Sequence, residues 1–240
     1  MKVVAIHQPH YFPWLGYLDK MAKADEFVVL DEVQFTDRSP MHRNKFLQLN
    51  GEAKLLSLSV CKKGYREKAT REIELSNWDE TRKKHRSFLE YNYKNAPFFD
   101  EVAPRIFPIF ETDFQTLLDI DMSTINILRD IFGITTEMTM QSSLPYDERS
   151  KNKDLMLDLC LATKGDVYLS GQGARAYMDD ERFNERGVGV AYQEFSYPVY
   201  PQKGQVSFVS GLSAIDCAFQ CGIDGARKVF YDNMRLEVAR

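Results

Sequence analysis

The chain lacks the features of a secreted or membrane protein. Its 240 residues contain no run approaching the roughly 18 consecutive apolar residues of a membrane-spanning helix. The apolar stretch near the start, Val3 to Ile6, is too short for the hydrophobic region of a signal peptide. We therefore expect a cytoplasmic protein with no transmembrane segment.

Cysteine is scarce, and positive charge is not in excess. The four cysteines, at positions 61, 160, 217 and 221, have the spacing of neither a disulfide framework nor a zinc site, so we expect free thiols and no metal site. The net charge is −4, which argues against nucleic acid as the main ligand. A local basic pocket for a phosphate or a nucleotide is still compatible with this balance.

Several catalytic signatures are missing as well. The sequence has no Gly-x-Ser-x-Gly nucleophile elbow, no Walker loop and no complete dinucleotide fingerprint. The cysteines lack an obvious reactive setting. Acid–base chemistry therefore has to come from histidines and carboxylates.

What the chain does have is an alternation of short apolar runs and helical patterns. Strands are predicted over 3–6, 27–30, 136–140, 167–169 and 188–195, and helices from Pro13 to Ala22 and over 150–163, 174–183, 212–221 and 226–236. This alternation predicts a Rossmann-like α/β fold, a mostly parallel sheet flanked by helices. In such sheets ligands bind beyond the carboxyl ends of the strands, at a topological switch point.

Two additions interrupt the alternation. Asn50-Gly51, between the alternating segments 45–49 and 54–60, predicts a β-hairpin. Helical patterns separated by prolines occupy about 78–132. We expect a single α/β domain over 1–240 that carries this mostly helical insertion.

A pair of histidines follows directly on the first predicted strand. Imidazoles at the carboxyl end of this strand can donate hydrogen bonds to phosphate or transfer protons near neutral pH. The alternative is a turn in which they cap backbone groups. Because polar residues surround the pair, we take His7 as a catalytic candidate and Gln8, His10 and Tyr11 as candidates for substrate binding.

The same run resembles the His-x-Gly-His loop of nucleotidyltransferases and class I synthetases. That loop binds ATP phosphates between the first strand and the first helix. His7 and His10 match its two histidines, but Pro9 replaces its glycine. Proline has no N–H to offer a phosphate, so homology with these loops stays an open question.

The segment after the second predicted strand is rich in hydrogen-bond donors. Arg38 and Arg43 could grip a phosphate bidentately, with Gln34 and Asn44 as further binding candidates. Asp31 is a second catalytic candidate, which could act as a base or coordinate Mg²⁺. A solvated loop with internal salt bridges accounts for the same charges equally well.

Two later loops complete the candidate set. Ser170-Gly171-Gln172-Gly173 follows a strand and opens a helix, so its backbone could bind an anion; a structural tight turn is the alternative. Tyr197, Tyr200 and Gln202 lie in a Pro- and Tyr-rich loop over 197–205. Its rings could stack on a sugar or a base, or could simply pack at the surface.

Taken together, these segments resemble the WbqC-like family of bacterial proteins. The motifs that carry the resemblance are AIHQPHYFPWLGY at 5–17, FVVLDEVQF at 27–35, Arg43-Asn44, YLSGQGA at 168–174, PVYPQ at 198–202 and GLSAID at 211–216. They follow in order over nearly the whole chain. Family members often have Asn where this chain has His10, which makes His7 the better candidate for chemistry.

The resemblance implies a role in O-antigen or other surface-polysaccharide (lipopolysaccharide) biosynthesis. Some members look like transferases that attach glycine or another acyl group to an amino sugar. We therefore expect an N-acyl or N-aminoacyl transferase acting on a nucleotide-linked amino sugar, with ATP or an activated acyl donor as co-substrate. A nucleotidyltransferase or adenylate-forming enzyme and a non-enzymatic binding protein are the alternatives. The donor, the sugar and a homodimeric state are left open.

Overall fold

A five-stranded parallel sheet forms the centre of the computed structural model, which describes residues 1–176, 178–202 and 207–234. The strands are β1 (Val3–His7), β2 (Glu26–Val29), β5 (Glu137–Met140), β6 (Val167–Ser170) and β7 (Gly189–Tyr192). Their order is β5-β2-β1-β6-β7. Counted along the chain this is 3-2-1-4-5, the doubly wound order, which reverses between β1 and β6. The predicted α/β class is confirmed, and the switch point lies between the ends of these two strands.

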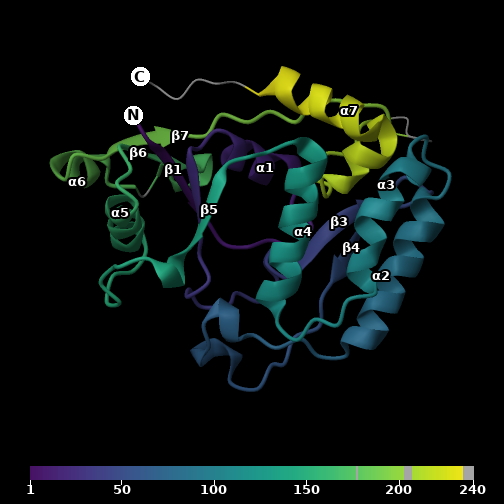
Figure 1. Ribbon diagram of the computed structural model, residues 1–240, viewed down its shortest axis with the longest axis horizontal. Helices are drawn as coiled ribbons and strands as arrows, with labels where there is room; N and C mark the ends of the chain where they lie inside the picture. The colour runs from purple at the N-terminus through teal and green to yellow at the C-terminus, as the bar shows by residue number, and fades with distance from the viewer. Residues whose placement is uncertain (177, 203–206, 235–240) are drawn as a thin grey trace.

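Helices cover both faces of the sheet (Figure 1). One face carries α1 (Leu15–Ala22), α4 (Leu117–Phe132) and α7 (Ile215–Asn233), and the other carries α5 (Lys153–Ala162) and α6 (Asp180–Glu185). Because successive side chains of a strand point to opposite faces, Ala5 joins the first core while Val4 and Ile6 join the second. The continuous apolar run of β1 is buried for this reason.

The predicted hairpin consists of β3 (Arg43–Leu47) and β4 (Ala53–Ser57). Gly51 in its turn has a φ of 89°, a backbone conformation that glycine adopts without strain. The hairpin contacts α2 (Trp78–Tyr93), since the Leu47 N–H donates to the Tyr93 hydroxyl at 3.0 Å. Figure 1 shows the hairpin together with α2 and α3 (Phe99–Ile106) on the side of the molecule away from α5 and α6.

The remaining elements are short 3₁₀ helices. They are η1 (Tyr65–Glu67), η2 (Thr70–Glu72), η3 (Phe107–Phe110), η4 (Gln141–Ser143) and η5 (Gln172–Ala174). Nowhere in the described ranges is a helix both long enough and apolar enough to cross a membrane.

Several element boundaries differ from those predicted. In the segment predicted as a helix over 174–183, Ala174 ends η5 and α6 begins at Asp180, and the strand predicted over 188–195 ends at Tyr192. The two helical patterns near the C-terminus are joined in α7, which kinks at Gly222. Positions 177, 203–205 and 235–236 of the predicted elements lie outside the described residues.

Candidate functional site

The strands β1 and β6 part at the switch point. The pairing of β1 with β2 continues to His7, whereas its pairing with β6 ends at Ala5 and Leu169. Just beyond that point, the ammonium group of Lys20 in α1 donates to the carbonyl oxygen of Ile6 at 2.8 Å. We call the place beyond Ala5 and Leu169, where these two strands no longer pair, the gap; the Lys20 side chain reaches it from α1.

Three rings stand close together at the end of β1. The ring centroids of His7 and His10 are 4.7 Å apart, and the Tyr17 ring lies 5.0 Å from His7 and 4.8 Å from His10. His10 Nδ1 and the Tyr17 hydroxyl are buried without a hydrogen-bond partner among the described residues. Buried polar atoms are normally paired with protein or water, so these groups have unused bonding capacity.

We call His7, His10, Tyr17, Lys20 and Ser170 the switch-point cluster. Burial lowers the pKa of His7 to about 3, helped by the charge of Lys20, and lowers the pKa of His10 well below its usual value. Burial also lowers the pKa of Lys20 to about 7. The sequence suggested imidazoles that titrate near neutral pH, but in the fold both are neutral there and the lysine titrates instead.

The tautomer of His7 follows from its neighbour. Its Nδ1 lies 3.1 Å from the Gln8 carbonyl oxygen. A carbonyl oxygen can only accept, so in the neutral ring Nδ1 carries the proton and Nε2 has a free lone pair. His7 therefore offers a proton acceptor on the side away from its own backbone.

The glycine loop after β6 borders the same gap. Ser170 has no exposed surface, and its hydroxyl has no partner within the described part of the chain. A side chain added at Gly171 or Gly173 would meet nothing within 4 Å, and neither residue has a positive φ. Neither strain nor crowding within the fold explains these glycines, which leave room for a ligand.

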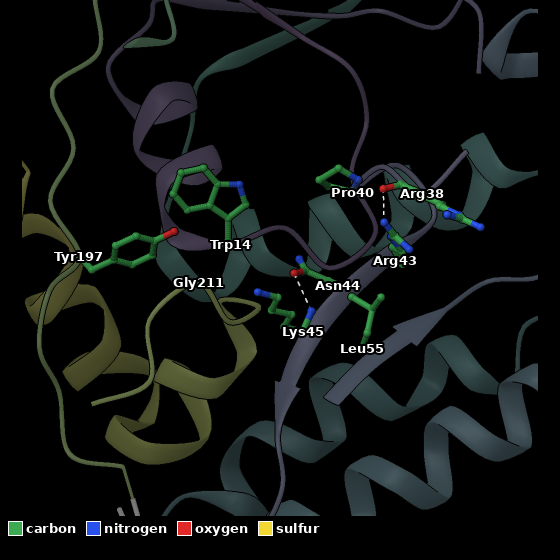
Figure 2. A pocket seen from close by; sticks show the side chains of 9 residues that line it. All are labelled: Trp14, Arg38, Pro40, Arg43, Asn44, Lys45, Leu55, Tyr197 and Gly211. Atoms are coloured by element: carbon green, nitrogen blue, oxygen red, sulfur yellow. Dashed lines mark hydrogen bonds between the residues drawn. The ribbon is translucent and has the colours of Figure 1, made fainter. Parts of the chain in front are cut away.

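A pocket of about 330 Å³ lies at the loop before β3 (Figure 2). We call it the aromatic–basic pocket; its lining residues are Trp14, Arg38, Pro40, Arg43, Asn44, Lys45, Leu55, Tyr197 and Gly211. Figure 2 shows Trp14 and Tyr197 on one side and Arg38 and Arg43 on the other. The fold thus brings together four of the predicted binding residues, at positions 38, 43, 44 and 197.

The lining of this pocket suits a phosphorylated ligand that carries a ring. It contains three cationic side chains and, as far as the chain is described, no carboxylate. Arg43 donates to the carbonyl oxygen of Arg38, which holds the two arginines in one loop. The rings of Trp14 and Tyr197 lie 5.6 Å apart. Guanidinium groups bind phosphate oxygens bidentately, and indole and phenol rings offer flat apolar faces with a polar edge.

The chain after His10 connects the pocket with the switch-point cluster. The Tyr11 N–H donates to the Pro40 carbonyl oxygen at 3.2 Å. Asn44 is buried, and its Nδ2 donates to the Phe12 carbonyl oxygen at 2.6 Å. The loop that carries Arg38 is therefore held against the backbone of the histidine run, and residues 10–14 lie between the aromatic–basic pocket and the switch-point cluster.

Two candidates beyond β2 have partners outside these hollows. The carboxylate of Asp31 is buried and accepts from both the N–H and the hydroxyl of Ser142. This contact ties the segment after β2 to the segment after β5. Gln34 is exposed and donates to the Arg66 carbonyl oxygen at 2.8 Å.

Three further candidates point into the protein. The Tyr200 hydroxyl and Gln202 Nε2 both donate to the carboxylate of Asp216, at 2.9 and 3.1 Å. The buried Tyr11 hydroxyl pairs with His85 Nδ1 at 2.9 Å. In the structure these groups hold loops in place, and their predicted contact with substrate is untested.

Gln172 stands apart from the other candidates. It is exposed and lines a different hollow, of about 340 Å³, with residues 194–196 and Asn233. This hollow lies beyond the carboxyl ends of β6 and β7, on the same edge of the sheet as the gap.

Trp14, Tyr17 and Lys20 were not among the site residues predicted from the sequence, although all three lie in the segment predicted as the first helix. Trp14 is half-buried and lines the pocket. The available signal was a lysine placed between the buried Leu18 and Met21. A charged side chain in a helix that is otherwise buried calls for an explanation.

Comparisons with known proteins cover most of this chain. Residues 8–228 match the model of the WbqC-like protein family. The chain is 31% identical over 227 residues to the uncharacterized protein Rv1507c of Mycobacterium tuberculosis, which covers 93% of this chain and 96% of that protein. No solved structure matches significantly. The matched range contains the aromatic–basic pocket and, apart from His7, the switch-point cluster.

Proposed function

The chain belongs to the WbqC-like protein family, and on that premise we propose that it is a transferase that forms an amide on a nucleotide-linked amino sugar, by N-acyl or N-aminoacyl transfer in surface-polysaccharide synthesis. The observation that carries the proposal is the connection between a cation-lined aromatic pocket and a neutral histidine pair at the switch point. The first fits a nucleotide-sugar, and the second fits proton transfer from its amine.

In this proposal the aromatic–basic pocket holds the acceptor. Arg38 and Arg43 bind the diphosphate, and Trp14 with Tyr197 packs against a sugar or base ring. The volume of about 330 Å³ is at the small end of the range for ligand sites, roughly 300–1,000 Å³. The amino group of the acceptor then has to reach His7 past residues 10–14, which separate the pocket from the switch-point cluster.

His7 accepts the proton of the attacking amine. The amine nitrogen forms a bond to the acyl carbon, Nε2 takes the proton, and the leaving group departs with the electron pair of the broken bond and receives that proton. Backbone N–H groups of residues 171–173 stabilise the oxyanion, whereas that of Ala174 donates to the Gly171 carbonyl oxygen at 3.0 Å. The low pKa of His7 keeps the imidazole neutral, and phosphates bound nearby would raise that pKa toward the working range.

Binding and turnover test the proposal separately. A thermal-shift screen with nucleotides, nucleotide-sugars and acyl-CoAs comes first, because a ligand raises the unfolding midpoint according to its concentration over Kd. We expect nucleotide-linked amino sugars to give the largest shift, and Arg43→Gln to weaken their binding roughly tenfold or more. Arg86→Gln is the matched control, because Arg86 pairs with Glu111 at the surface.

His7→Ala tests the chemistry. With an amino-sugar nucleotide and an activated acyl or glycyl donor, mass spectrometry should detect the amide product. The variant should bind the acceptor normally and turn over roughly 100-fold more slowly. Full activity of a folded His7→Ala protein, or equal acceptor binding by wild type and Arg43→Gln, would refute the proposal.

The position of the two histidines supports one alternative, an adenylate-forming or nucleotidyl-transferring enzyme. They stand between β1 and α1 at the switch point, where nucleotide phosphates bind in doubly wound folds. Such an enzyme would exchange labelled pyrophosphate into ATP without any amine acceptor. An amide transferase that uses a preformed donor would show no exchange.

A further inference from the structure

Lys20 is a buried lysine with no acidic partner in the described part of the chain. Its side chain has 4% exposure, its ammonium donates one hydrogen bond, to Ile6, and it forms no ion pair with any described residue. Removing a charge from water is costly unless an opposite charge compensates it. An apolar side chain at this position of α1 would avoid that cost. The two remaining donors of the ammonium therefore point to a ligand.

The register of the sheet places a second unpartnered group across the gap. The pairing of β1 with β6 ends at Ala5 and Leu169, so Ile6 would face Ser170 if it continued by one residue. Ser170 is fully buried with an unpaired hydroxyl. Its side chain shares a sheet face with Tyr168, and the Lys20 ammonium lies 5.9 Å from the Tyr168 ring centroid. Lys20 and Ser170 thus border the same gap from opposite sides.

We propose that the gap between β1 and β6 is a binding site for a small oxyanion, a carboxylate or a phosphoryl group, held by the Lys20 ammonium and the Ser170 hydroxyl. Both groups donate hydrogen bonds, which an anion accepts. The role of the ligand rests on the proposed function: it is the carboxylate or phosphoryl end of the acyl donor, while the aromatic–basic pocket holds the acceptor.

The affinity of this site depends on pH through Lys20. The titratable groups that interact with the ammonium are His7 at the end of β1, His10 after it, Cys160 of α5 and Tyr168 of β6. Tyr17 and Asp19 are its titratable neighbours along α1. Burial keeps the two imidazoles neutral and raises the pKa of the Cys160 thiol to about 12. The Asp19 carboxylate accepts hydrogen bonds from Lys23 Nζ at 3.0 Å and from Nε2 of Gln193, the residue after β7, at 2.6 Å.

The protonated form of Lys20 binds the anion, and its pKa in the empty site is about 7. Affinity is therefore expected to be highest below that pH and to fall up to tenfold for each pH unit above it. Arginine at this position stays charged throughout the range. Lys20→Arg should therefore bind anions with little pH dependence.

The test uses sulfate and acetate as separate probes, because both keep a constant charge between pH 6 and 9. NMR spectra of protein with ¹³Cε-labelled lysine should show one resonance, absent from Lys20→Met, that titrates near pH 7. A carboxylate site predicts that acetate raises this apparent pKa, and a phosphoryl site predicts that sulfate does so. A titration that neither anion moves would overturn the proposal.

Variants separate ligand binding from folding. Lys20→Met should fold, because it replaces a buried charge by an apolar chain of similar length, and should lose the anion-induced rise in unfolding midpoint. Ser170→Ala should weaken anion binding several-fold. Lys94→Met, at an exposed lysine, is the matched control and should behave as wild type. Wild-type anion binding by Lys20→Met would also overturn the site.

A double comparison distinguishes this proposal from the proposed function. Lys20→Met should retain nucleotide-sugar binding, and Arg43→Gln should retain the sulfate or acetate effect on Lys20. If nucleotide-sugars fail to bind while an anion still shifts the Lys20 titration, the transferase proposal fails and the oxyanion site stands. If nucleotide-sugars bind while no anion shifts the Lys20 titration, the oxyanion site fails and the transferase proposal stands.

Discussion

The carboxyl group of Asp121 in α4 lies near the phenol groups of Tyr11 and Tyr17. It has no exposed surface, and neither oxygen has a partner among residues that the structure describes. Burial raises its pKa well above the usual range. Burial also raises the pKa values of Tyr11 and Tyr17, and the charge of ionised Asp121 adds to both shifts. Asp121 is therefore protonated well above the pH at which an exposed aspartic acid ionises.

This burial makes stability depend on pH. The folded state holds the Asp121 proton more tightly than the unfolded chain, so unfolding releases a proton above the unfolded pKa of 3.8. Stability contributed by this group therefore falls, by up to about 1.4 kcal/mol per pH unit, as pH rises from that value to the folded pKa. Asp121→Asn should remove this loss and unfold at higher urea than wild type at pH 7.

Urea unfolding at several pH values checks this prediction. The advantage of Asp121→Asn should shrink toward pH 4, where the wild-type group is protonated in both states. Exposed Asp113→Asn is the control and should show no such trend. A constant or inverted difference across pH would mean that Asp121 has a partner that stabilises its ionised form.

At the scale of elements, α7 contains a kink that fits a single residue type. Gly222 has φ 73° and ψ 175°, a region that is essentially restricted to glycine. A Cβ atom there would lie 2.7 Å from Phe98 Cδ1 and 2.8 Å from a Glu101 carboxylate oxygen. The kink lets the start of α3 pack closely against α7.

Gly222→Ala should therefore destabilise the protein by about 2–4 kcal/mol through backbone strain and steric overlap. Gly225→Ala in the same helix is the matched control. An added Cβ at Gly225 would meet only the Cys221 side chain, at 3.2 Å. Alanine is more favourable than glycine inside a helix by about 1 kcal/mol. Urea unfolding of both variants measures the difference; equal stabilities would show that α7 straightens at little cost.

At the scale of the whole molecule, Asp216 joins segments that are far apart in the chain. Its buried carboxylate accepts hydrogen bonds from the Tyr93 hydroxyl of α2 and from Tyr200 and Gln202 of the Pro- and Tyr-rich loop. The loop that carries Tyr197 is thereby fixed at one end against α7 and α2. The ring of Tyr197 itself remains partly exposed.

Two tyrosines of this loop should therefore respond differently to substitution. Tyr200→Phe removes one hydrogen bond to a carboxylate and should lower the free energy of unfolding by about 1–3 kcal/mol, with ligand affinity unchanged. Tyr197→Ala should leave stability nearly unchanged and weaken nucleotide-sugar binding. Parallel urea unfolding and calorimetric titration separate the two effects; weaker ligand binding by Tyr200→Phe at full stability would place Tyr200 in the site.

The local pattern of the sequence was sufficient for the class of fold. β-branched runs, helical stripes and the Asn50-Gly51 turn act over a few residues, so the parallel sheet and the hairpin could be predicted from them. The start of α6 and the end of β7 could not be predicted in this way. The chain there is held by contacts with distant segments, such as the hydrogen bond from Asn233 to the Ser196 carbonyl oxygen.

For the site, the sequence by itself determined the family and the His7–His10 pair at the end of the first strand. Only the tertiary structure decided that burial keeps both imidazoles neutral, that Trp14 meets Tyr197 beside two arginines, and that Lys20 enters the gap without an acid. The physical reason is that pKa values and pocket walls depend on desolvation and on contacts between distant segments. The sequence specifies which residues are present, but the packing of the sheet and helices determines how exposed each residue is to solvent and which residues it contacts.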